Sequence, residues 1–306
     1  MNNNRIIARN KTTDKTYIVY PKTDFKYGKN KDIDWDNMEL LNSNYKYEDM
    51  DTLKYRLSDT LKNNDDMLDI SHLNLDEFPI LGGKYIILYD KIKYLCCNDN
   101  NLRDLSDIFK FKNLKVLNCS NNKISELIDV PNGIVEICCE SNKLDNLDII
   151  DQCPMLERLM CSHNNINELL DIPMIKSLYC DNNKITKLGN MPRLVYLNCK
   201  NNNLQELPYL PNITDIECDN NQILVLHDYP KLLSLFCGSN LLSEINLTSD
   251  IKMLHCDNNN LKYIPFISSL KELTCDINSK LHSQYKNKII DYKENKKSNI
   301  ICIYLD

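Results

Sequence analysis

The sequence predicts a solenoid of short parallel β-strands whose outer side is mostly free of helix. Two observations lead to this fold class: cysteines recur at nearly fixed intervals, and an asparagine stands three residues after each of them. The intervals are 22, 20 and 22 residues, followed by 19 residues six times. Such a period is typical of proteins in which each repeat forms one coil that stacks on the previous coil. The ten cysteines in register are Cys97, Cys119, Cys139, Cys161, Cys180, Cys199, Cys218, Cys237, Cys256 and Cys275.

Each repeat is predicted to begin with a short strand. Leu197 and Cys199 are two residues apart and should point into the core, while Tyr196 and Asn198 should point to the opposite, solvated face. Because the chain returns to the same place after every repeat, the strands must lie parallel. The asparagine that follows, Asn202 in this repeat, falls where the chain turns, and its amide should bond to the backbone of its own coil and the next one.

The return legs are too short for helices. Only five residues, 189–193, separate Leu188 from Leu194. Two insertions, 106–113 and 148–155, are each long enough for a short helical turn. A helix requires more lateral space than a strand, so helices on the return side would force the sheet to curve strongly. Return segments without helices therefore predict a gently curved sheet with a flat concave face.

The repeat template resembles that of leucine-rich repeat proteins, with Cys at the third core position, over residues 68–278. The repeat length is similar to that of the short class in secreted bacterial effectors. The Cys-for-Leu exchange and the abundance of Asn, Lys, Ile and Tyr also resemble leucine-rich repeat proteins of giant DNA viruses. The resemblance implies a protein-binding scaffold. Unlike the effector ligases, the chain ends at Asp306, without room for their catalytic domain.

The two ends are predicted to cap the open core of the solenoid. Residues 1–66 form an N-terminal cap with a short strand at 16–20 and an amphipathic helix around Leu53 and Leu57. Residues 67–278 hold a partial first repeat and the ten repeats in register. Residues 279–306 form a C-terminal cap, in which a Lys-rich stretch at 286–297 leads to a terminal strand at 300–305. A partner-docking tail is the alternative for this last segment.

Charge and hydropathy narrow the class of protein. The formal net charge is −6, and residues 67–278 carry 28 acidic and 19 basic residues. This acidity disfavours nucleic acid as a partner, although the basic C-terminal segment leaves that alternative open. No apolar run reaches the roughly 18 residues of a membrane span, and the first ten residues lack the apolar core of a signal peptide. We therefore expect a soluble, unexported protein without a membrane partner, and we favour a monomer.

The ten cysteines in register are predicted to be buried free thiols, whereas Cys96 and Cys138 should project from the concave face. Neighbouring ladder thiols on adjacent parallel strands keep a Cβ separation near ~4.8 Å, wider than a disulfide takes. A straight file of thiols also lacks the tetrahedral convergence that zinc requires. So many reduced thiols favour a reducing, cytoplasmic location, such as a host cytoplasm. A thiol-based enzyme or sensor is the third function class, with Cys96 and Cys138 on the concave face as its candidates.

No enzyme signature is present: six glycines leave no phosphate-binding loop, and the five histidines are scattered over different repeats. We expect no catalytic residue, no metal and no cofactor. The informative surface is the concave face, where aromatic rings lie in an acidic field that suits a basic, extended protein segment. The predicted partner-binding residues are Tyr94, Arg158, Tyr179, Asp181, Tyr196, Asp215, Glu217, Asp219, Phe236, His255 and Asp257. The alternative function is a passive structural or particle-associated repeat protein without a specific ligand.

Overall fold

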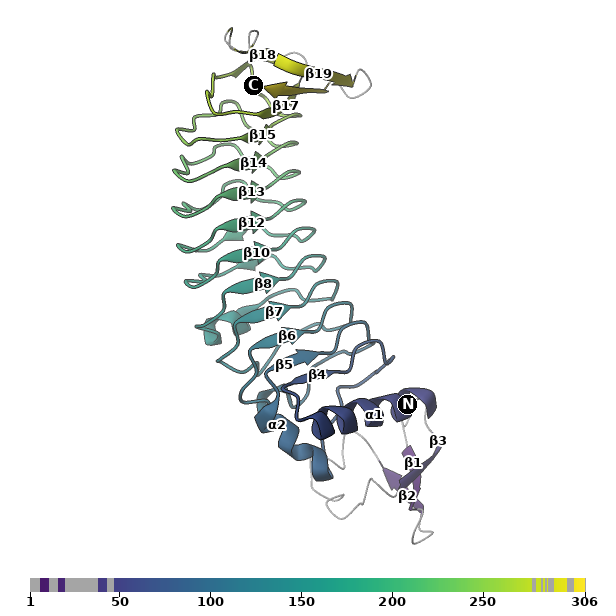
Figure 1. Cartoon of the computed structure of the whole chain (residues 1–306). Coiled ribbons are helices and arrows are strands. Elements are labelled where there is room, and N and C mark those ends of the chain that lie inside the picture. Colours follow the sequence, from purple (N-terminus) through teal and green to yellow (C-terminus); the bar gives the residue numbers. More distant parts are fainter. Residues whose placement is uncertain are drawn as a thin grey trace.

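The computed structural model describes residues 6–10, 16–19, 38–42, 47–276, 279–281, 283, 285, 289–295 and 300–305. The chain winds into a long, gently curved stack of coils, with one strand of each coil side by side along one face (Figure 1). Eleven parallel strands form most of a 13-stranded sheet. They are β4 (Met67–Asp69), β5 (Tyr94–Cys96), β6 (Val116–Asn118), β7 (Glu136–Cys138), β8 (Arg158–Met160), β10 (Ser177–Tyr179), β12 (Tyr196–Asn198), β13 (Asp215–Glu217), β14 (Ser234–Phe236), β15 (Met253–His255) and β17 (Glu272–Asp276). The predicted curved parallel solenoid is confirmed.

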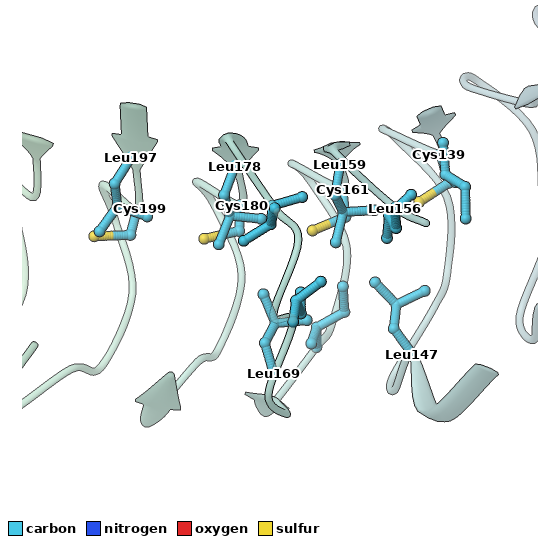
Figure 2. Close-up of a cluster of buried hydrophobic side chains, with 14 of the residues drawn as sticks. Cys139, Leu147, Leu156, Leu159, Cys161, Leu169, Leu178, Cys180, Leu197 and Cys199 are labelled. Carbon is cyan, nitrogen blue, oxygen red and sulfur yellow. The ribbon is translucent and has the colours of Figure 1, made fainter. Parts of the chain in front are cut away.

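The strands pair in strict repeat register. Leu178 of β10 lies beside Leu197 of β12, which in turn lies beside Ile216 of β13. These middle residues and the ladder cysteines that follow them are fully buried, and Figure 2 shows Cys139, Cys161, Cys180 and Cys199 in successive coils. The sulfur file therefore forms part of a continuous apolar core, as the spacing predicted.

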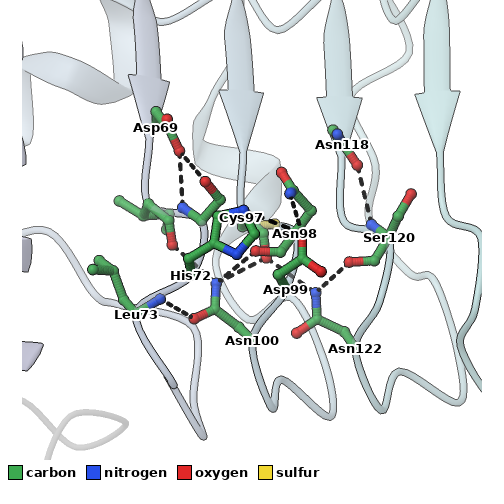
Figure 3. A network of polar contacts seen from close by, with 12 residues as sticks. Asp69, His72, Leu73, Cys97, Asn98, Asp99, Asn100, Asn118, Ser120 and Asn122 are labelled. Atoms are coloured by element: carbon green, nitrogen blue, oxygen red, sulfur yellow. Dashed lines mark hydrogen bonds and ion pairs between the residues drawn. The ribbon is translucent and has the colours of Figure 1, made fainter.

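The asparagine of each repeat connects its coil to the preceding one. Asn221 Nδ2 donates to the carbonyl of Cys218 at 3.1 Å in its own coil and to that of Cys199 at 2.9 Å in the coil before. Its Oδ1 accepts from the backbone N–H of Leu204 at 3.0 Å. Figure 3 shows the same arrangement at Asn100 and Asn122. The expectation that this amide reaches the next coil was wrong in direction, because the turn aims it backwards along the stack.

A left-handed residue stands two positions after each of the nine ladder cysteines from Cys97 to Cys256. The φ angles lie between 53° and 56°, a region in which Asn and Asp are favoured among residues other than glycine. The residues are Asp99, Asn121, Ser141, His163, Asn182, Asn201, Asn220, Ser239 and Asn258. The polar residue at this position therefore serves the turn, which also accounts for His163.

The return side is mostly irregular backbone, as predicted. The two insertions hold the short 3-10 helices η3 (Ile108–Lys110) and η4 (Asp148–Gln152). Short parallel pairs join β9 (Glu168–Leu169) to β11 (Lys187–Leu188) and β16 (Tyr263–Ile264) to β18 (Lys280–Leu281). Between the first two coils, η2 (Gly83–Ile87) runs into the short helix α2 (Leu88–Lys91), where no helix was predicted.

Helix α1 (Tyr47–Asn63) lies at the first coil. Leu53 and Leu57 are buried in the core, and Arg56 Nη1 donates to the carbonyl oxygen of Asp69 at 3.2 Å. Before the helix, β1 (Ile6–Asn10) pairs antiparallel with both β2 (Thr16–Val19) and β3 (Met38–Asn42). Strand β2 lies within the predicted 16–20, whereas β1 and β3 were not predicted.

An antiparallel hairpin extends the sheet at the other end. Strand β20 (Ile300–Leu305) pairs with β17, and β19 (Ile289–Asn295) pairs with β20. Strand β20 occupies the predicted 300–305, and Ile303 is buried. Strand β19 lies within the Lys-rich stretch, for which no strand was predicted. Asn278 and His282 lie outside the described residues.

Candidate functional site

The solvent-facing side of the 13-stranded sheet is the concave face. Each three-residue strand buries its middle side chain and directs the first and third outward, so that Tyr196 and Asn198 flank the buried Leu197 on β12. Because the register is strict, outward side chains of successive coils lie side by side in files along the stack. Sequence positions one repeat apart therefore become contacts on this face.

Two tyrosines and a glutamate form the first part of a contact cluster. The rings of Tyr179 and Tyr196, on β10 and β12, lie 4.8 Å apart between centroids. The Tyr196 hydroxyl donates to Glu217 Oε1, on β13, at 2.7 Å. Burial raises the pKa of Tyr196, and its hydrogen bond to Glu217 raises it further. The hydroxyl therefore stays protonated, and the two rings have a fixed orientation on the sheet.

A lysine continues this cluster to the second aromatic pair. Lys200 Nζ lies 2.6 Å from Glu217 Oε2 and 3.4 Å from Asp219 Oδ2. The same ammonium lies 5.4 Å from the centroid of the Phe236 ring, within the range of a cation–π contact. Burial lowers the pKa of Lys200, but its hydrogen bonds and charge contacts with Glu217 and Asp219 together outweigh this effect, so the pKa is raised. Lys200 is thus held as a cation among acids and an aromatic ring.

Phe236 and His255 form the second aromatic pair, with ring centroids 4.3 Å apart. His255 Nε2 lies 3.0 Å from Glu272 Oε1 on β17. Except for Tyr179 on β10, these side chains come from the last five parallel strands, β12 to β17, and from the residues just after them. We call the whole cluster the concave patch; its members are Tyr179, Tyr196, Lys200, Glu217, Asp219, Phe236, His255, Asp257 and Glu272.

Seven of the predicted residues thus fall in the concave patch and four do not. Tyr94 and Arg158 lie on β5 and β8; Arg158 pairs with Glu136 at 3.4 Å instead. Asp181 accepts from the Ser162 hydroxyl at 2.5 Å. Asp215 accepts from the Thr214 hydroxyl at 2.6 Å, at the margin of the sheet. These four residues lie on the concave face outside the cluster of ring contacts, although the Asp215 charge contributes to the raised pKa of Tyr196.

Lys200 and Glu272 are the residues that sequence reasoning missed as members of the site. Both occupy outward positions in the repeat, and both lie one or two repeats from predicted residues. The repeat spacing could have revealed the contact of Lys200 with the site. Asp219 follows Lys200 by 19 residues, one repeat, so the two residues occupy the same position on neighbouring coils. Lys200 was not predicted as a site residue because a single basic residue among acidic ones suggests only that it neutralises their charge.

The outward thiols are not activated for chemistry. Burial raises the pKa of Cys138 to about 12, with a further increase from the nearby Glu136 carboxylate. Burial also raises the pKa of Cys96, and the Asp69 charge adds to that effect. Because the thiolate is the nucleophile, both sulfurs are poor candidates for catalysis or redox sensing.

Within the described part of the chain, no three His, Cys, Asp or Glu side chains are grouped as the ligands of a metal ion would be. Among the helices that the structure describes, none has the length and apolar character needed to cross a membrane.

Comparisons with known proteins agree with this architecture. The family model described as Leucine Rich repeats (2 copies) matches residues 90–132. No curated protein matches the chain. Among solved structures, YopM from Yersinia enterocolitica WA-314 superposes with a TM-score of 0.70 at 24% identity, covering 85% of this chain and 56% of that one.

A second similar structure is the functional domain of InlJ from Listeria monocytogenes, which is described as including a cysteine ladder. It superposes with a TM-score of 0.57 at 26% identity, covering 74% of this chain and 55% of that one. YopM from Yersinia pestis, a leucine-rich effector protein, gives a TM-score of 0.60 at 23% identity, with 74% and 76% covered. The chain thus spans just over half the length of the first two proteins. The register of the repeats, the parallel solenoid and these likenesses show that the chain folds as a leucine-rich repeat solenoid.

Proposed function

We propose that the protein is a non-enzymatic interaction scaffold that binds a basic, extended segment of a partner protein on the concave patch. The observation that carries the proposal is the coupling of two aromatic pairs to a row of carboxylates on one rigid sheet. Rings supply contact area with little loss of side-chain entropy, and carboxylates steer and select a cationic partner. Leucine-rich repeats generally act as scaffolds for protein partners, which supports the class of function.

The rigidity of the face also supports binding. The patch side chains come from strands locked by the sheet and by the asparagine bonds between coils. A partner would therefore meet rings that are already oriented, and less ordering entropy would be lost on association.

Affinity capture from cell extract tests the proposal, with three versions of the protein as bait. The wild type is compared with the double variant Tyr179→Ser plus Phe236→Ser, which removes one ring from each pair. The matched control is Tyr209→Ser plus Phe109→Ser, which removes the same two residue types from exposed positions outside the sheet.

We expect the wild type and the control to retain one basic protein that the concave variant loses. Raising the salt concentration from about 0.1 M to about 0.5 M should weaken its retention, because exposed charge pairs are screened. Equal retention by the concave variant, or equal loss from the control, would contradict binding on the concave patch. A protein that retains nothing in any version would fit a passive structural role instead.

We also propose that the protein works in a reducing compartment. Twelve of the described cysteines, from Cys96 to Cys256, are free thiols. Oxidation to disulfides would require neighbouring strands to move, so we expect exposure to oxidised glutathione to lower the melting temperature and not raise it. A raised melting temperature would contradict this location.

A further inference from the structure

The position directly after each ladder cysteine forms a file along one margin of the concave face. From the coil of Cys180 onward it reads Asp181, Lys200, Asp219, Gly238, Asp257 and Asp276. Lys200 stands between two acids, and so does Gly238. The position of Lys200 therefore carries a cation of the protein itself, whereas the position of Gly238 has no side chain.

The contacts of Lys200 show how this margin holds an ammonium group. Its Nζ lies 3.4 Å from Asp219 Oδ2 and 2.6 Å from Glu217 Oε2, and it approaches the Phe236 ring to 5.4 Å. Two carboxylates and one ring thus surround a lysine at the edge of the patch. Carboxylates and an aromatic ring are typical contacts of a partly exposed ammonium group on a protein surface.

At Gly238 two carboxylates lean toward the same point without a cation between them. A Cβ atom on Gly238 would lie 3.1 Å from Asp219 Oδ1 and 3.3 Å from Asp257 Oδ1. Gly238 N donates to Asp219 Oδ1 at 2.8 Å, which fixes one of the two acids. A lysine ammonium can donate to two carboxylates at about 2.8 Å each, and here it would approach both from the solvent side.

The second acid has no lysine or arginine partner among the described residues. Asp257 Oδ2 accepts from Asn258 Nδ2 at 3.1 Å. Burial raises the pKa of Asp257, and the charges of Asp219 and Asp276 raise it further, whereas the charge interaction with the nearby His255 lowers it. The rings of Phe236 and His255, on the adjacent file, would contact the methylene groups of an incoming side chain.

We propose that this place, the Gly238 notch formed by Asp219, Gly238 and Asp257 beside Phe236, receives a lysine side chain of the partner protein. The partner's ammonium would take the place in the file that Lys200 fills two coils earlier. The proposal rests on the proposed function and specifies the chemistry of its partner at one point of the patch.

The direct test follows the Gly238 amide by NMR with glycine-selective ¹⁵N labelling. The chain has only six glycines, so the spectrum is simple, and loss of one peak in Gly238→Ala assigns it. The probe is an octalysine peptide, and its fully Nε-acetylated form is the control. We expect octalysine to shift the Gly238 peak more than the other five glycine peaks and the acetylated peptide to leave it in place.

Two matched pairs of variants measure the effect on affinity by fluorescence anisotropy of labelled octalysine. Gly238→Lys fills the notch with an internal cation, whereas Ser162→Lys adds the same charge at the equivalent position four coils earlier, between Glu140 and Asp181. We expect Gly238→Lys to raise the dissociation constant about tenfold or more and Ser162→Lys only about twofold, by a general charge effect. Asp257→Asn should likewise weaken binding more than Asp181→Asn.

The outcomes separate this proposal from the function on which it rests. Octalysine could bind the wild type and leave the Gly238 peak unmoved, or the two variants of each pair could have equal effects. Either result would overturn the proposed lysine site at the Gly238 notch but not the proposed binding on the concave patch. Failure of octalysine to bind wild type at low salt would overturn both. A Gly238 shift caused by calcium chloride and not by octalysine would replace the lysine with a metal ion and overturn the proposal.

Discussion

The Tyr196 hydroxyl donates to Glu217 Oε1 across two adjacent coils, at 2.7 Å. This bond links the first aromatic pair to the carboxylates that hold Lys200, and so it connects the two halves of the concave patch. It exists because residues 21 apart in sequence occupy neighbouring positions on parallel strands.

The ionisation of Tyr196 reports on this contact. Burial and the Glu217 carboxylate both raise the pKa of Tyr196. We expect Glu217→Gln to lower that pKa toward the ordinary tyrosine value of about 10, because the negative neighbour is removed. NMR of protein with ¹³Cζ-labelled tyrosine, titrated from neutral to alkaline pH, measures it. A Tyr196 signal that titrates identically in both proteins would show that the bond is absent in solution.

The asparagines between coils should be major contributors to stability. Asn221→Ala leaves the buried carbonyls of Cys199 and Cys218 and the N–H of Leu204 without their partner. We expect a loss of about 3 kcal/mol or more in the free energy of unfolding, since each unsatisfied buried group costs about 1–3 kcal/mol. Denaturant titration measures the loss.

The neighbouring Asn220 provides the control for this variant. It is exposed and has a left-handed φ of 56°, so Asn220→Gly keeps the turn and removes only a surface bond to Asn201. We expect this change to cost about 1 kcal/mol at most. Equal losses for the two variants would contradict the role of Asn221 between the coils.

Truncation of the buried residue of a strand should destabilise the fold, whereas truncation of an exposed residue two positions earlier, just before the strand, should not. Leu197 is fully buried, whereas Val195 is 41% exposed. Leu197→Ala should cost about 2–5 kcal/mol in the free energy of unfolding. Val195→Ala should cost under about 1 kcal/mol. A cost for Leu197→Ala as small as that for Val195→Ala would mean that the coils do not stack as described.

These contacts also show what the sequence could and could not predict. The spacing of Leu197 and Cys199 was sufficient for the strands, their faces and the parallel register, because burial alone determines them. The direction of the Asn221 amide was not predictable, since it depends on the turn geometry at Asn220. Strands β1, β3 and β19 were missed because they lie outside the repeats, where no periodicity repeats the signal. Within the patch, the residues were predicted from their outward positions, but the role of Lys200 required its distances to Glu217 and Phe236.

The buried thiols predict a loss of stability at alkaline pH. Burial raises the pKa of Cys119 to about 12 and raises those of the other described ladder cysteines for which a shift is resolved. A thiol whose folded pKa is higher than its unfolded pKa holds its proton more tightly when folded. Its contribution to stability is therefore complete below the unfolded pKa of about 8.5 and is lost as the pH rises toward the folded pKa.

We therefore expect the free energy of unfolding to fall steeply from about pH 9 to about pH 11. The triple variant Cys180→Ala, Cys199→Ala and Cys218→Ala should show a shallower fall, although it is less stable at neutral pH. Denaturant titrations at several pH values measure both slopes. Parallel curves for the variant and the wild type would mean that these thiols are not buried.

Site-specific photocrosslinking tests binding on the concave face most directly. A photoreactive benzoylphenylalanine replaces Asn198, which lies between the patch residues Tyr179 and Glu217, or Tyr209, on the return side of the same repeat. After irradiation in cell extract, we expect position 198 to crosslink to a basic protein and position 209 to give no such product. Equal crosslinks from both positions, or a crosslink from position 209 alone, would contradict the concave patch as the binding surface.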